Sequence, residues 1–256
     1  MQNVLEEVFY KKRESGKKAL MPFLPAGYPD KESFVKYIEE MDRFSDIIEI
    51  GVPFSDPVAD GPVVEKASNI ALENGVNLPW IFDTLKYLKG RVKSKIVLMG
   101  YCNPFFKYGW EKVAEDAKDA GVVGIIVADL PLEESDEIRK ILRAHDINLI
   151  YLVGLNTSNE RMKRYADVCS GFVYFVSVLG TTGMREKLPD ELIDKIKQAR
   201  QIFSIPIAIG FGIKSPKQIE DIYEFIDGVV FGSALINHID EKKDVKGFFE
   251  LWKGYI

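Results

Sequence analysis

Eight short apolar runs alternate with polar segments along this chain, and this alternation limits the available folds more than any other feature. The runs are rich in Val, Ile, Leu and Phe, as expected of parallel strands that are buried on both faces. They span residues 19–24, 46–50, 95–100, 124–128, 148–152, 171–176, 205–210 and 228–231. Helical spacing of apolar residues, three to four positions apart, occurs between them at 31–44, 110–120, 132–144, 190–200 and 216–225.

These repeated units predict an α/β protein, a (β/α)8 TIM barrel, in a single domain over residues 1–256. An open doubly wound sheet also uses alternating units, but eight even repeats without a linker or a break in composition favour closure. Two elements lie outside the repeat. Residues 3–16 predict an N-terminal helix that covers the bottom of the barrel, and the long segment 60–90 predicts an extra helix after strand two.

Charge and composition argue against several classes of partner and cellular location. The formal net charge of −5 gives no electrostatic reason to expect binding to nucleic acid or to an anionic membrane. No apolar run approaches the roughly 20 residues of a membrane span, and Glu6 and Glu7 interrupt an opening stretch that resembles neither a signal peptide nor a transit sequence. Cys102 and Cys169 have no metal-ligand spacing, so reduced thiols in the cytoplasm are expected.

A single carboxylate, Glu49, interrupts the apolar second strand. An ionised group buried there would lose several kcal/mol of hydration, so it needs partners, a raised pKa or a function. It would be a structural residue if it bonded to the barrel interior, and the strand itself could be misplaced. In a barrel the catalytic groups lie where strands end and βα loops begin, and the position of Glu49 at the end of its strand therefore favours catalysis.

The loop that follows, residues 52–62, contains three prolines and ends in Asp60-Gly61-Pro62. Asp60 would be a helix cap if it merely preceded a helix that starts with proline. The loop also returns over the barrel mouth, so Glu49 and Asp60 can present two carboxylates to one ligand. Two carboxylates in different environments can divide acid/base and electrostatic roles.

Glycines mark the ends of the last two strands. Gly210 and Gly212 close strand seven, and Gly232-Ser233 follow strand eight at the start of a predicted helix. Either pair alone is explained by a tight turn. Together they predict a phosphate site, because glycine permits close backbone approach and a helix start offers free N–H groups to an anion. The loop at 179–183 is either a plain surface loop or one that closes over the ligand.

Few other groups are suited to proton transfer. The only histidines, His145 and His238, fall away from the strand ends, so neither a histidine base nor a histidine metal site is expected. Tyr101 and Tyr174 each lie at a strand end. They can donate a proton or line an aromatic pocket, although core packing is the usual role of strand tyrosines.

The segment at 49–62 reads Glu-Ile-Gly-Val-Pro-Phe-Ser-Asp-Pro-Val-Ala-Asp-Gly-Pro and resembles the signature of tryptophan synthase alpha chains. Further matches follow in order at 22–29, 99–104, 127–131, 180–183, 210–212 and 232–234. The resemblance implies a lyase of tryptophan biosynthesis that splits indole-3-glycerol phosphate into indole and glyceraldehyde 3-phosphate. It implies no metal and no organic cofactor in this chain.

The resemblance also implies residue roles. Glu49 matches the general acid/base, Asp60 the carboxylate that accepts the indole N–H, and Tyr174 a tyrosine that assists near the glycerol end. Matches to the substrate pocket and its lid are Phe23, Tyr101, Ala128, Thr182 and Phe211, and matches to the phosphate site are Gly183, Gly212, Gly232 and Ser233.

The family works with a partner, the beta subunit, which holds pyridoxal phosphate and receives indole through a tunnel in an α2β2 heterotetramer. Pro53, Asp56 and Pro57 match the segment that contacts this partner. Two rival functions remain open at this point. A flavin enzyme on the same barrel would be yellow when purified, and a barrel that only binds an allosteric partner would have no need of both Glu49 and Asp60.

Overall fold

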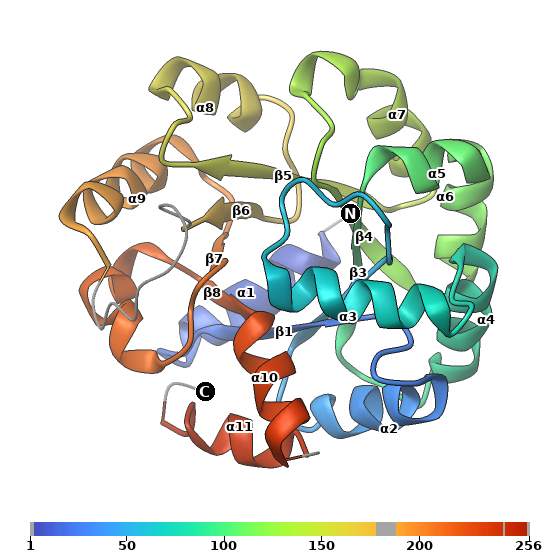
Figure 1. Ribbon diagram of the computed structural model, residues 1–256. Helices are drawn as coiled ribbons and strands as arrows, with labels where there is room; N and C mark the ends of the chain where they lie inside the picture. The colour runs from blue at the N-terminus through green and yellow to red at the C-terminus, as the bar shows by residue number, and fades with distance from the viewer. Residues whose placement is uncertain (1–2, 178–187, 243, 255–256) are drawn as a thin grey trace.

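The computed structural model describes residues 3–177, 188–242 and 244–254, and its strands form a closed parallel barrel (Figure 1). β1 pairs with β2 on one side and with β8 on the other, which closes the sheet. The strands are β1 Ala19–Pro25, β2 Ile47–Gly51, β3 Lys95–Gly100, β4 Val122–Val127, β5 Asn148–Gly154, β6 Val173–Val176, β7 Ile207–Gly210 and β8 Gly228–Phe231. The predicted barrel is confirmed, and the strand ends differ from the predicted ones by at most two residues.

Helices surround the barrel (Figure 1) because each crossover returns along its outside. They are α1 Val4–Glu14, α2 Lys31–Met41, α3 Pro62–Glu73, α4 Leu78–Leu88, α5 Cys102–Tyr108, α6 Trp110–Asp119, η1 Leu132–Glu134, α7 Asp136–Ala144, α8 Asn159–Ala166, α9 Asp190–Ile202, η2 Pro216–Phe225, α10 Ser233–Lys242 and α11 Lys246–Glu250. The predicted extra helix after strand two is confirmed, since both α3 and α4 follow β2. Helix α5 was not predicted, and the predicted helix at 216–225 is a 3-10 helix. Within the described ranges, no helix has the length and apolarity needed to cross a membrane.

The N-terminal helix α1 covers the floor of the barrel, as predicted. Its Leu5 and Phe9 are fully buried. A Cβ on Gly228 would meet the Phe9 ring at 2.7 Å, and a Cβ on Gly124 would meet Leu5 at 3.2 Å. Both glycines lie near the start of a strand, so α1 packs against the amino ends of β4 and β8. The βα loops emerge at the opposite end, which is where barrels of this kind bind their ligands.

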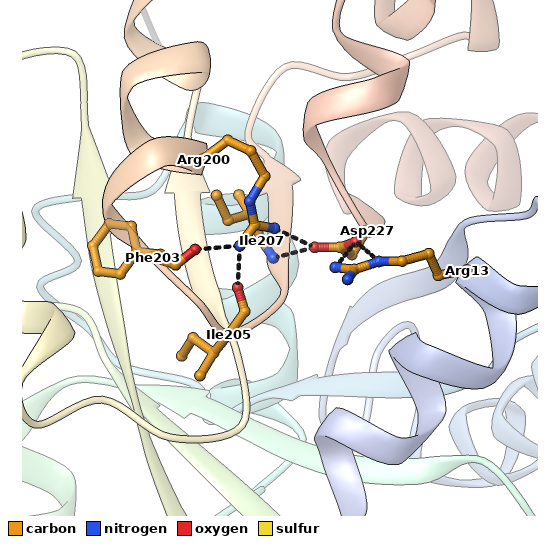
Figure 2. A network of polar contacts seen from close by, with 6 residues as sticks. All are labelled: Arg13, Arg200, Phe203, Ile205, Ile207 and Asp227. Carbon is orange, nitrogen blue, oxygen red and sulfur yellow. Dashed lines mark hydrogen bonds and ion pairs between the residues drawn. The ribbon is translucent and has the colours of Figure 1, made fainter.

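A buried carboxylate ties α1 to the strands above it (Figure 2). Asp227 precedes β8 and is 4% exposed. It accepts hydrogen bonds from Arg13 of α1 at 2.6 and 3.0 Å and from Arg200 of α9 at 2.9 Å. The backbone N–H of Ile207, at the start of β7, donates to the same carboxylate at 2.8 Å. One side chain thus fixes the floor helix, α9 and the amino ends of β7 and β8.

Candidate active site

Glu49 is the third of the five residues of β2, not at the end of the strand as predicted, and it pairs in register with Phe23 of β1 and Val97 of β3. Its side chain is fully buried, and neither carboxylate oxygen has a hydrogen-bond partner among the described residues. The structural role considered for Glu49, in which the carboxylate bonds to the barrel interior, has no support among the described residues. Burial, helped by the nearby Asp60 carboxylate, raises the pKa of Glu49 to about 8.

Asp60 lies in the loop between β2 and α3 and faces the same cavity as Glu49. Burial raises its pKa, while a hydrogen bond from the Tyr101 hydroxyl acts in the opposite direction. The same hydroxyl accepts the backbone N–H of Ala59 at 3.0 Å, so Tyr101 anchors this end of the loop. The helix-cap interpretation of Asp60 is wrong, because the N-cap of α3 is Gly61 and no side chain caps that helix.

Tyr174 of β6 is buried across the cavity from β2, where burial and the carboxylates of Glu49 and Asp60 raise its pKa. Its phenol therefore stays protonated near neutral pH and can donate a hydrogen bond. The Phe211 ring packs edge-on against it at 5.7 Å between ring centroids. A Cβ on Gly210 would overlap the Tyr174 hydroxyl, so glycine is required where β7 ends.

The loop after β7 takes an unusual backbone path. Phe211 has a φ of 63° and Gly212 a φ of 85°, both in the left-handed region that most side chains avoid. Ser177, at the end of β6, stabilises this path. Its hydroxyl donates to the carbonyl of Gly210 at 2.7 Å and also contacts the Phe211 carbonyl. The side of Gly212 that a Cβ would occupy is open space.

Helix α10 starts at Ser233, directly after Gly232. The first N–H groups of a helix have no intrahelical carbonyl to bind, so they can bind an anion. A Cβ on Gly232 would meet the Phe23 ring at 2.9 Å, which explains glycine at this position. Gly212, Gly232 and Ser233 line the same cavity as the two carboxylates.

This cavity has a volume of about 580 Å³ and lies at the barrel mouth, a size suited to a small organic ligand. It is lined by Phe23, Glu49, Ala59, Asp60, Gly61, Pro62, Val63, Val64, Met99, Tyr174, Phe211, Gly212, Lys214, Val230, Gly232 and Ser233. Eight residues predicted from the sequence are thus brought together: Phe23, Glu49, Asp60, Tyr174, Phe211, Gly212, Gly232 and Ser233.

The other predicted residues lie elsewhere. Tyr101 is outside the lining and acts on the loop that carries Asp60, and Ala128 lines a separate cavity of about 90 Å³ beside β5. Thr182 and Gly183 lie outside the described residues. Lys214 also lines the cavity and was not predicted, although a cation two residues after the glycines of strand seven was a readable signal. Ser177, which no motif marks, was not predicted either.

In the loop predicted to contact a partner, Pro53 is buried, Pro57 is half-buried and Asp56 is exposed. Val58 of the same loop is 83% exposed, and Phe106 of the nearby α5 is 70% exposed. Within the described ranges no three metal-ligating side chains gather in one place.

Comparisons with known proteins show which family this chain resembles. A family model described as tryptophan synthase alpha chain matches residues 9–248. A curated tryptophan synthase alpha chain from Solidesulfovibrio magneticus is 54% identical over 254 residues, with 99% of each chain covered. A solved structure from Aquifex aeolicus has a TM-score of 0.89 at 32% identity and covers 99% of this chain and 98% of its own. A chain from a Pyrococcus furiosus structure, titled as the tryptophan synthase α2β2 complex, has a TM-score of 0.86 at 36% identity and covers 93% of this chain and 98% of its own.

Proposed function

The chain belongs to the tryptophan synthase alpha chain family, and we propose that Glu49, Asp60 and Tyr174 carry out the family's reaction in the cavity at the barrel mouth. That reaction splits indole-3-glycerol phosphate into indole and glyceraldehyde 3-phosphate, in tryptophan biosynthesis. The observation that carries the residue assignment is the buried Glu49 carboxylate, which faces the cavity without a hydrogen-bond partner among the described residues.

Glu49 acts as the general acid and then as the general base. Because its pKa is raised to about 8, the carboxyl group holds a proton at neutral pH. It delivers this proton to indole carbon 3, which converts the ring to an indolenine-like cation. The resulting carboxylate then removes the proton from the adjacent glycerol hydroxyl. The electrons of the O–H bond form the aldehyde, the carbon–carbon bond breaks, and its electrons return to the ring.

Asp60 stabilises the charge that develops on the ring. A carboxylate that accepts the indole N–H interacts most strongly when the ring is cationic, so it favours the intermediate over the substrate. Tyr101 supports this role of Asp60. The hydrogen bond from its hydroxyl favours the ionised carboxylate and so opposes the rise in the pKa of Asp60 that burial causes. Burial, together with the nearby Glu49 and Asp60 carboxylates, raises the pKa of Tyr174, so its neutral phenol would donate a hydrogen bond near the glycerol oxygens.

The remaining predicted residues bind the substrate. Phe23 and Phe211 provide apolar walls for the indole ring. The N–H groups at Gly212, Gly232 and Ser233 would bind the phosphate, together with Gly183. Ala128 lines a separate cavity, so its role in substrate binding rests on the family resemblance alone, as does that of Thr182.

The partner of the chain is the beta subunit of tryptophan synthase. We propose that Pro53, Asp56 and Pro57 lie in the contact segment, with Val58 and Phe106 as the exposed apolar side chains that the partner covers. The alpha chain needs no cofactor of its own for this acid/base chemistry, and pyridoxal phosphate belongs to the partner. We propose a cytoplasmic location, as expected for a biosynthetic enzyme of this kind.

The direct test is to incubate the purified chain with indole-3-glycerol phosphate, with and without a beta subunit, and to follow indole release. Release from the wild-type chain, strongly reduced in Glu49→Gln, is the expected result. Absence of indole under both conditions would refute the proposed reaction. Cleavage that the beta subunit does not accelerate would refute the proposed partner contact while leaving the chemistry in place.

A further inference from the structure

The charges around the cavity are distributed unevenly. The carboxylates of Glu49 and Asp60 enter from β2 and the loop after it, whereas Lys214 enters from the loop after β7. Among the described residues that line the cavity, Lys214 is the one cation. It is exposed, and within the described ranges no carboxylate forms an ion pair with it.

The backbone around Lys214 is held in place by one side chain. The Gln218 carbonyl oxygen accepts the backbone N–H of Lys214 at 2.7 Å and that of Ser215 at 3.1 Å. The amide nitrogen of Gln218 donates to the Gly212 carbonyl at 3.4 Å. Ser215 and Gln218 also form the capping box that starts η2. The segment from Gly212 to Ser215 is therefore one ordered unit, which keeps Lys214 beside the predicted phosphate site.

We propose that Lys214 is a substrate-binding residue that contacts the phosphate group and sets the direction in which the substrate lies. This inference rests on the proposed function. Backbone N–H groups carry only partial charges, whereas the phosphate of the substrate carries close to two negative charges at neutral pH. A mobile ammonium group complements that charge, and hydrogen bonds between charged partners are stronger than neutral ones.

The same arrangement excludes binding of the substrate in the reversed orientation. A phosphate placed beside Glu49 and Asp60 would meet two acidic groups and lose the Lys214 contact. Lys214 thereby selects phosphorylated substrates and directs the indole ring toward the carboxylates. Selectivity of this kind depends on repulsion at one end as well as attraction at the other.

The test compares Lys214→Gln and Lys214→Arg with the wild-type chain. For indole-3-glycerol phosphate at low ionic strength, Lys214→Gln should lower kcat/KM about tenfold, mainly through KM, as expected for loss of one charged hydrogen bond. Lys214→Arg should restore most of this loss. The effect should shrink as salt is added. For indole-3-glycerol, which lacks the phosphate, Lys214→Gln should leave kcat/KM within about twofold.

A matched control is Lys17→Gln, which makes the same charge change in the segment between α1 and β1, at the floor of the barrel. It should retain the wild-type kcat/KM. Binding of inorganic phosphate, followed by phosphorus NMR titration, gives a second measurement that does not depend on turnover. Phosphate should bind about tenfold more weakly to Lys214→Gln than to the wild-type chain or to Lys17→Gln.

Unchanged kcat/KM and unchanged phosphate binding in Lys214→Gln would overturn the proposal while the proposed function stood. An equal loss with indole-3-glycerol would also overturn it, because the defect would then not depend on the phosphate. If the wild-type chain released no indole, the proposed function would fail, and the phosphate titration would still decide whether Lys214 binds the anion.

Discussion

Replacing Glu49 by Gln should make the protein more stable at alkaline pH and almost inactive. Gln has nearly the shape of a protonated Glu but cannot ionise. Burial, with a smaller effect from Asp60, raises the pKa of Glu49 from 4.5 to about 8 in the folded protein. The folded state therefore keeps a proton that the unfolded chain releases, which makes stability depend on pH.

The sign and size of the effect follow from this shift. A carboxyl group with a raised pKa contributes stability that is fully present below about pH 4.5 and is lost as the pH rises through about 8. A shift of this size corresponds to at most about 5 kcal/mol, and relaxation around the charge reduces it. We expect the wild-type protein to lose roughly 2 to 4 kcal/mol relative to Glu49→Gln between pH 5 and pH 9.

Urea unfolding of both proteins at these two pH values measures the difference in unfolding free energy. The titration of groups that both proteins contain cancels in this comparison. Glu115→Gln, at an exposed site on α6, is the matched control and should follow the wild type at both pH values. In the same preparations kcat for indole release should fall about a thousandfold in Glu49→Gln. A stability difference that does not change with pH would disprove that Glu49 is buried in its protonated form. Near-normal turnover would disprove its catalytic role.

Three further substitutions test other parts of the structure. Asp60→Asn should lower kcat about a hundredfold, because a neutral amide stabilises the cationic ring less; steady-state indole release measures this, and a loss below threefold contradicts it. Ser177→Ala removes the hydroxyl that bonds to the Gly210 and Phe211 carbonyls and should raise KM about fivefold, the equivalent of one hydrogen bond. Ser177→Thr should keep KM near the wild-type value, and an equal rise in both variants would argue against the hydrogen bond. Asp227→Asn should lower the free energy of unfolding by about 2 to 4 kcal/mol, because two arginines lose their buried partner, while kcat is retained; an unchanged urea midpoint would contradict it.

The sequence predicted the barrel because buried parallel strands have a simple signature. Strands such as β1 and β2 are apolar at almost every position and buried throughout, so their limits could be read closely. Glu49 was predicted for the same reason, since one carboxylate is conspicuous in such a strand. The glycines at 210 and 212 were readable because few other residues tolerate the backbone path or the closeness of Tyr174.

Features that depend on contacts between loops could not be predicted. Ser177 stabilises the loop after β7 by bonding to backbone carbonyls of another strand, and nothing in its neighbouring residues indicates that distant acceptor. The cap interpretation of Asp60 failed because Gly61 occupies the N-cap position. Helix α5 was missed because it spans only seven residues, too few for a clear helical period.

The amino ends of β7 and β8 contribute stability, whereas their carboxyl ends contribute to the site. This separation explains how the chain accommodates the buried Glu49. At the amino ends, Asp227 joins α1 and α9 to both strands through charged hydrogen bonds. At the carboxyl ends, the left-handed backbone at Phe211 lowers stability. The buried Glu49 of β2, which lines the same cavity, also lowers it, because its carboxyl group has no hydrogen-bond partner among the described residues. Because the stabilising contacts lie at the floor, the residues at the mouth can be selected for chemistry, as expected for this barrel class. Variants at Asp227 and Glu49 should therefore have additive effects on unfolding free energy, since they share no contact.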